Sequence, residues 1–266
     1  MDKQYKTISI NQQNSVVTIE LNRPDLHNAM NDTMIAELTE AINETDKEQS
    51  VRIVVLRGKG KSFCAGADLN YMKGIAGFGF EENVRDGKKL AALFCAIYDC
   101  PLPTIALVHG AAFGGANGLL AACDIVIAEE NTTFAFSEVK IGIAPATISP
   151  FVIKRIGEFG AKDLMMTGKR FKGPEAEKWH LVNRSVSEDK LEETLQQYIK
   201  QLLSSAPEAV KVTKNMISEV IASDDFDETI SSMAHLIATL RAFDEGQEGM
   251  SAFLEKRKAK WVTSNK

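Results

Sequence analysis

The sequence lacks the features that mark secreted, membrane-spanning and zinc-binding proteins. Its four cysteines form no CxxC pair and have no histidine partners at zinc spacing, so neither a disulfide framework nor a metal site is expected. No apolar run approaches the roughly 20 residues that a membrane helix requires, and the first residues carry no apolar signal stretch. We therefore expect reduced thiols in a soluble, cytoplasmic protein with no membrane partner.

A positive net charge is also missing. The net charge of −5 over 266 residues argues against general binding to nucleic acid, because a phosphate backbone favours a positively charged face. The basic run from Lys256 to Lys260 is a local exception. Nucleic acid is therefore not an expected partner.

Several nucleotide-binding and hydrolase motifs are absent as well. Gly60-Lys61-Ser62 ends like a phosphate-binding loop, but the position of its leading glycine is occupied by Val55. The sequence contains no GxSxG, no HExxH and no GxGxxG after a predicted strand. The sequence therefore lacks the motifs that usually indicate P-loop nucleotide binding, serine hydrolysis, zinc-dependent proteolysis or dinucleotide binding.

Short β-rich runs alternate with helical segments over the first two-thirds of the chain. One helix is predicted after Asn31-Asp32, a plausible N-cap, and another from about Glu82 to Tyr98, before two prolines. The predicted strands are Val16–Leu21, Ile53–Leu56, Thr104–Val108 and Ile125–Ile127. This alternation indicates an α/β fold.

From about Leu191 onward the strand signal disappears and consecutive helices are predicted. Ser205-Ala206-Pro207-Glu208 fits a capping box with proline at the first helical position. We therefore divide the chain into a core over residues 1–200 and an all-helical region over residues 201–266. The apolar content of the helical region exceeds what short helices bury alone, which favours packing on the core or on another subunit.

Two loops rich in small residues each follow a predicted strand directly. They are Phe63–Leu69 and His109–Gly118. Glycine and alanine allow a ligand to approach the backbone closely, and a helix starting near Gly115 would direct free N–H groups toward it. Two such donors could stabilise the oxygen of a thioester enolate by about 3–4 kcal/mol each.

At this point a family resemblance becomes specific. In order and spacing, the chain resembles the crotonase (enoyl-CoA hydratase/isomerase) superfamily, and its pattern is closest to methylglutaconyl-CoA hydratase-like members. The matching segments are Leu21–Pro24, His27–Ala29, Phe63–Leu69, Gly114–Gly115, Ala122–Ile125, Phe136–Gly142 and Phe253–Arg257. The resemblance implies a ββα spiral core followed by a C-terminal helical trimerisation region.

The resemblance also implies roles for individual residues. The backbone N–H groups of Ala67 and Gly115 would hold the thioester oxygen, and Glu138 would act as the general acid/base. Apolar residues around Glu138, including Ile141, would raise its pKa. The implied substrate- and CoA-binding residues are His27, Ala29, Ala65, Gly66, Asp68, Leu69, Gly114, Gly118, Phe253 and Lys256.

One position departs from the family pattern. Hydratases of this family use two glutamates, and the position resembling the first is Gly118. Hydration of a 2-enoyl-CoA is the first expectation, because Gly142–Pro150 resembles the methylglutaconyl-CoA hydratase branch. A Δ3,Δ2-enoyl-CoA isomerase using Glu138 alone is the alternative, followed by a non-catalytic or RNA-binding protein of the same fold.

The implied partners are an acyl-CoA substrate and further copies of the chain, as a homo-trimer or a dimer of trimers. No metal and no cofactor beyond the coenzyme A of the substrate is expected. A carboxylated acyl group would need a cation, for which Lys154 and Arg155 are positioned, although both fit solvated helix residues better.

Overall fold

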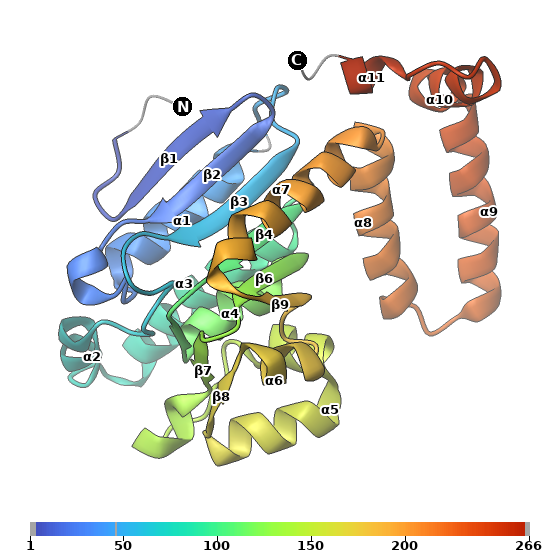
Figure 1. Cartoon of the computed structure of the whole chain (residues 1–266). Helices are drawn as coiled ribbons and strands as arrows, with labels where there is room; N and C mark the ends of the chain where they lie inside the picture. The colour runs from blue at the N-terminus through green and yellow to red at the C-terminus, as the bar shows by residue number, and fades with distance from the viewer. Residues whose placement is uncertain (1–3, 46, 264–266) are drawn as a thin grey trace. The chain divides into compact units, whose positions relative to one another are not determined.

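The computed structural model describes residues 4–45 and 47–263, and its chain forms two compact units (Figure 1). The first unit holds the residues up to Cys100 together with Thr104–Leu195. The second holds Pro101–Pro103 and the chain from Gln196 onward. Residues of helix α7, Glu188–Ser204, belong to both.

The main sheet of the first unit has six strands in the order β1-β2-β3-β4-β6-β9. The strands are β1 (Ile8–Gln13), β2 (Val16–Leu21), β3 (Ile53–Gly58), β4 (Thr104–Val108), β6 (Ile125–Glu129) and β9 (Arg184–Val186). Only β1 and β2 pair in antiparallel fashion; the other neighbours are parallel. All of β4 and most of β3 are buried, as continuous apolar runs in a parallel sheet predict. The four predicted strands are confirmed.

A second, three-stranded sheet lies in the same unit. It consists of β5 (Ala111–Phe113), β7 (Thr133–Ala135) and β8 (Arg170–Lys172), with β7 in the middle. The rings of Phe134 and Phe136 stack on Phe171 with centroid distances of 5.6 and 6.2 Å. This buried aromatic stack fixes the chain that leads from β7 to Glu138.

The first unit contains six further helices and two 3-10 turns within the described residues. They are α1 (Asp32–Thr45), α2 (Leu69–Ile75), α3 (Phe80–Tyr98), α4 (Gly115–Ala122), α5 (Ser149–Thr167), α6 (Gly173–Lys178), η1 (Pro24–Leu26) and η2 (Ser137–Ile141). The side chain of Asn31 accepts a hydrogen bond from the N–H of Met34 at 2.9 Å, so the predicted cap of α1 is confirmed. Helix α3 begins at Phe80, slightly earlier than the sequence predicts.

The second unit is helical, as the sequence predicts. Its elements are the end of α7, then α8 (Pro207–Ala222), α9 (Phe226–Ala242), α10 (Asp244–Leu254) and α11 (Lys260–Thr263). The predicted capping box at Ser205 is wrong, because Ala206 is the N-cap of α8 and has no side-chain cap. The carboxylate of Glu245 instead accepts the N–H groups of Glu208 and Ala209, at 3.1 and 2.9 Å. Proline at the first helical position is confirmed.

Large apolar side chains of the second unit are exposed in the single chain. The most exposed are Ile221, Phe226, Phe243, Phe253 and Leu254, with exposed fractions of 60–83%. This exposure agrees with the apolar surplus that the sequence predicts for the helical region. Among the residues that the structure describes, no helix combines the length and the apolar character needed to cross a membrane.

Candidate active site

The two loops predicted to form the site lie side by side in the structure. Cys64 forms an isolated parallel bridge with Ala112. The N–H of Cys64 donates to Ala111 at 3.0 Å, and the N–H of Phe113 donates back to Cys64 at 3.2 Å. A Cβ on Gly66 would lie 3.0 Å from the carbonyl oxygen of Phe113, so this contact requires a very small residue at position 66.

The first loop presents the amide of Ala67. Met30 donates its N–H to Gly66 at 2.7 Å and accepts the N–H of Asp68 at 2.8 Å, so it bridges over Ala67. Within the described part of the chain, the N–H of Ala67 has no acceptor. The backbone on both sides of this amide is therefore fixed, while its proton remains available to a ligand.

The second loop presents the amide of Gly115. Gly114 has φ 52° and ψ −123°, a conformation that an L-residue rarely adopts. Helix α4 begins at Gly115, whose N–H has no acceptor among residues 4–45 and 47–263. A Cβ on Gly115 would lie 2.9 Å from the terminal methyl of Met30. Met30 therefore contacts both loops that carry the free amides.

Glu138 lies against the second loop. Its Oε1 would be 3.3 Å from a Cβ on Gly114, so only glycine leaves ample room for the carboxylate. Its Oε2 is buried and has no hydrogen-bond partner. Burial away from water raises the pKa of this carboxyl above its ordinary value of 4.5. Phe134 and Phe136 are fully buried nearby in the chain, whereas Ile141 is 60% exposed and is not part of an apolar enclosure in the single chain.

The position of the missing second glutamate is filled by other side chains. A Cβ on Gly118 would clash with Cγ2 of Ile148 and would lie 2.7 Å from Cζ of Phe94. Both Phe94 and Ile148 are almost fully buried. The space that a glutamate would need at position 118 is therefore occupied by packed apolar groups.

Other predicted substrate-binding residues cluster around the first loop. The N–H of Ala65 donates to the carbonyl of His27 at 2.9 Å, and the ring Nδ1 of His27 lies 3.1 Å from the Ser62 hydroxyl. The carbonyl oxygen of Ala29 accepts from Arg23 at 2.5 Å. Leu69 opens α2 and is 74% exposed.

Asp68 has a clear structural role next to Ala67. Its carboxylate caps α2 by accepting the N–H groups of Asn70 and Tyr71, and it pairs with Arg23 at 2.7 Å. Burial raises the pKa of Asp68, but these hydrogen bonds outweigh that effect and hold it below its ordinary value. Asp68 therefore stays ionised, and its contacts with Arg23 and with the start of α2 hold the backbone next to the Ala67 amide in place.

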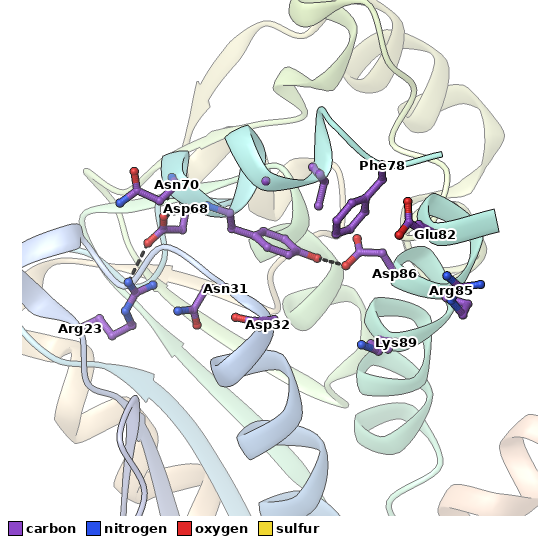
Figure 2. A pocket seen from close by; sticks show the side chains of 13 residues that line it. Arg23, Asn31, Asp32, Asp68, Asn70, Phe78, Glu82, Arg85, Asp86 and Lys89 are labelled. Carbon is purple, nitrogen blue, oxygen red and sulfur yellow. Dashed lines mark hydrogen bonds and ion pairs between the residues drawn. The ribbon is translucent and has the colours of Figure 1, made fainter. Parts of the chain in front are cut away.

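A cavity of about 580 Å³ is lined in part by Asp68 (Figure 2). Figure 2 shows Arg23 directed at Asp68. The Tyr71 hydroxyl donates to the carboxylate of Asp86 at 2.6 Å. Asp68 is the only predicted site residue in its lining, so the cavity is separate from the free amides and Glu138. The lining residues are Arg23, Asn31, Asp32, Asp68, Asn70, Tyr71, Gly74, Ile75, Phe78, Glu82, Arg85, Asp86 and Lys89.

The remaining predicted residues lie elsewhere. Phe253 and Lys256 belong to the second unit, where Phe253 is 83% exposed and Lys256 has a positive φ of 55°. Arg155 is not a solvated helix residue as expected, because it donates to the carbonyl oxygens of Leu181 and Cys123 and to the side chain of Asn183. Lys154 is exposed and donates to the Tyr98 hydroxyl at 2.6 Å.

The Cys64 thiol and the possible metal-ligating side chains complete the description of these loops. Burial raises the pKa of the Cys64 thiol to about 12, so it stays protonated. Among the described residues, no three His, Cys, Asp or Glu side chains are grouped so that they could hold a metal ion.

Comparisons with known proteins show the family to which this chain is similar. The model of a family described as enoyl-CoA hydratase/isomerase matches residues 11–264. A crotonyl-CoA hydratase of Syntrophomonas wolfei is 31% identical over 97% of this chain and 99% of its own length. The crystal structure of an enoyl-CoA hydratase from Shewanella pealeana is 37% identical, with a TM-score of 0.94 over 98% of this chain and 97% of the other. Pseudomonas aeruginosa AtuE is 35% identical, with a TM-score of 0.93 over 97% and 100%.

Proposed function

Because the chain belongs to the enoyl-CoA hydratase/isomerase family, the crotonase superfamily, we propose that it adds water across the 2,3 double bond of an acyl-CoA thioester. The observation that supports this most strongly is the pair of free amides at Ala67 and Gly115, on two loops that are hydrogen-bonded to each other. These amides donate to the thioester oxygen and stabilise the negative charge that develops there in the enolate.

Glu138 moves the proton in this reaction. Its carboxylate takes a proton from the water whose oxygen attacks Cβ, while the electrons of the double bond move onto the thioester oxygen. The protonated Glu138 then donates to Cα as the carbonyl re-forms, so one water molecule is added overall. A carboxyl with a raised pKa and an unpartnered oxygen suits both steps.

A turnover screen tests the proposal. The protein is mixed with short, branched and carboxylated 2-enoyl-CoA thioesters, and the loss of absorbance of the conjugated thioester is followed. We expect at least one of them to be hydrated at a rate far above that of the buffer. If none is hydrated, the hydratase assignment is wrong.

A second candidate function is supported by the closed position at Gly118. With Phe94 and Ile148 filling that space, Glu138 is the only carboxylate of the predicted pair. A single carboxylate is enough to move a proton between Cγ and Cα of a 3-enoyl-CoA, which is the isomerase reaction. Conversion of 3-enoyl-CoA to 2-enoyl-CoA without any addition of water would establish this alternative.

The acyl group is proposed to carry a carboxylate, following the resemblance to methylglutaconyl-CoA hydratases. Lys154 is the more suitable partner for that carboxylate, because the guanidinium of Arg155 already donates to three protein oxygens. Preference for carboxylated over uncharged thioesters in the same screen, lost in Lys154→Met, would support this choice. An equal rate with both classes would contradict it.

The RNA-binding alternative is weakened by the surroundings of the basic run. Arg257 pairs with Glu248 and Glu255, and the amine of Lys260 lies 3.9 Å from Glu248. These acidic partners reduce the positive field that a phosphate backbone would meet.

The assembly, cofactor and location are proposed together with the activity. A homo-trimer or a dimer of trimers would cover the exposed apolar residues of the second unit, and light scattering at micromolar concentration tests this. No cofactor beyond the coenzyme A of the substrate is needed, so activity should survive dialysis against a chelator. A cytoplasmic location suits the free thiols, and cell fractionation tests it.

A further inference from the structure

Asn117 occupies a buried position just inside helix α4, and one polar atom of its side chain has no hydrogen-bond partner. Its exposed fraction is 0%, and its main-chain N–H donates to the carbonyl of Gly114 at 2.9 Å. Its side-chain amide donates to the carbonyl oxygen of Ala135 at 2.9 Å. The oxygen of the same amide, Oδ1, is buried without a partner. A buried unpaired acceptor lowers the free energy of unfolding, so an apolar residue at this position would give a more stable core.

The main-chain bond of Asn117 determines the direction of the Gly115 amide. The carbonyl of Gly114 and the N–H of Gly115 belong to one planar peptide group and point in opposite directions. When Asn117 holds the carbonyl of Gly114, it also fixes the plane and turns the Gly115 N–H away from α4. Gly114 has no Cβ to restrict rotation of this plane, so hydrogen bonds are needed to anchor it.

The side-chain bond of Asn117 links this plane to the second sheet. The carbonyl oxygen of Ala135, at the end of β7, accepts both the Asn117 amide and the N–H of Gly114, each at 2.9 Å. Ala135 precedes Glu138 by three residues, on the chain that the aromatic stack fixes. One carbonyl therefore connects the loop that holds the oxygen of the substrate to the segment that carries the proton-transferring carboxylate.

We propose that Asn117 is a positioning residue that fixes the Gly115 amide, and through Ala135 the segment carrying Glu138, for stabilisation of the enolate oxygen. This inference rests on the proposed function, because it assigns Asn117 to the same oxyanion site. Asn117 itself does not touch the reacting atoms; its side chain acts through the carbonyl of Ala135, which also accepts the N–H of Gly114 and so holds the residue before the Gly115 amide.

Two variants test this role. Asn117→Leu keeps a similar volume and removes both polar atoms of the side chain, while Asn117→Ala removes the side chain. Both variants keep the main-chain bond to Gly114, so they test the side-chain bond to the carbonyl of Ala135. We expect kcat to fall by about tenfold or more in both, with KM changed by less than about threefold, because a misdirected donor weakens the transition state more than the bound substrate. Thr45→Val is the control: it removes a fully buried hydrogen bond at the end of α1, away from the site. Its thermal unfolding is expected to shift while kcat is unchanged.

A spectroscopic measurement reports the donor directly. A 4-dimethylaminocinnamoyl-CoA thioester absorbs at longer wavelength when donors polarise its carbonyl, so bound probe should show a red shift in the wild-type protein. The shift is expected to shrink in both Asn117 variants and to persist in Thr45→Val, with the probe still bound. A wild-type shift that both variants retain, with unchanged kcat, overturns the positioning role and leaves the proposed function standing. The absence of any red shift or turnover in the wild-type protein overturns the proposed function and this inference with it.

Discussion

Two positions where the family resemblance expects a glutamate have opposite surroundings in this structure. At position 138 the carboxylate lies over a glycine, with one buried oxygen left without a partner. At position 118 the glycine faces the ring of Phe94 and a methyl of Ile148, which leave no room for even one added carbon. One wall of the site is thus arranged to hold a reactive group, and the other is closed by packing. The absence of a carboxylate at position 118 therefore involves its neighbours as well as the residue itself.

The largest expected effect is on the open side, at Glu138. Glu138→Gln should lower the hydration rate by about 10²–10⁴-fold, because the amide cannot exchange the proton that the reaction requires. Initial rates with the best 2-enoyl-CoA substrate measure this. Glu158→Gln, on the exposed face of α5, is the matched control and should be fully active. If Glu138→Gln is as active as the wild type, the two positions do not differ in function.

The pH dependence of turnover sharpens the same contrast. Glu138 must be ionised to take a proton from water, and burial raises its pKa above 4.5. We therefore expect kcat/KM to fall by about tenfold per pH unit below that raised pKa, at higher pH than for an ordinary glutamate. A profile measured from pH 4.5 to 8 should show this limb in the wild type and not in the residual rate of Glu138→Gln. A wild-type rate that is flat across this range would contradict the assignment.

The closed side is tested by stability. Gly118→Ala should lower the free energy of unfolding by about 1–3 kcal/mol, because its Cβ overpacks against Phe94 and Ile148. Gly87→Ala in α3 is the matched control. A Cβ there meets nothing within 4 Å, so this variant should gain about 0.5–1 kcal/mol. Urea denaturation of both variants measures the difference, and an equal change in the two would show that position 118 is not closed.

A smaller effect is expected in the stability of Glu138→Gln. Burial raises the pKa of Glu138 in the folded state, so ionisation destabilises the folded wild type as the pH rises through that pKa. The glutamine variant should therefore match the wild type near pH 4 and become more stable toward pH 8. Thermal unfolding midpoints at both pH values measure this. If the unfolding midpoint of the wild type instead rises relative to that of the variant as the pH rises, the effect has the opposite sign, which would contradict the burial of this carboxyl.

The regular part of the fold could be predicted because apolar patterning determines it. The four predicted strands and the cap of α1 follow from their local sequence. Strand β1 could not be found in this way, because Ile8–Gln13 is largely polar and lies at the edge of the sheet. Strands β5, β7 and β8 have only three residues each, which is too few to show the alternation of apolar and polar residues that predicts a strand.

The contacts that shape the site were harder to predict, because they join distant parts of the chain. The glycine-rich loops were evident from composition, and Glu138 from the family pattern. The roles of Met30, Phe94 and Ile148 depend on tertiary packing and left no signal in their own segments. Asn117 did leave one, since a polar residue inside the apolar stretch that follows Gly115 is unusual. The start of α8 shows the same limit, because its cap comes from Glu245, far along the chain.

The packing around Gly118 also bears on how such a protein can evolve. The glycine codons GGA and GGG differ from a glutamate codon by a single base, so a second carboxylate can be one mutation away in the genetic code. In this chain the new side chain would clash with Phe94 and Ile148, and both would have to be replaced by smaller residues before it could fit. Variants carrying only some of these substitutions would have either an overpacked core or a cavity in it. The packing of Phe94 and Ile148 therefore opposes a two-carboxylate arrangement in this chain even where the codon allows it.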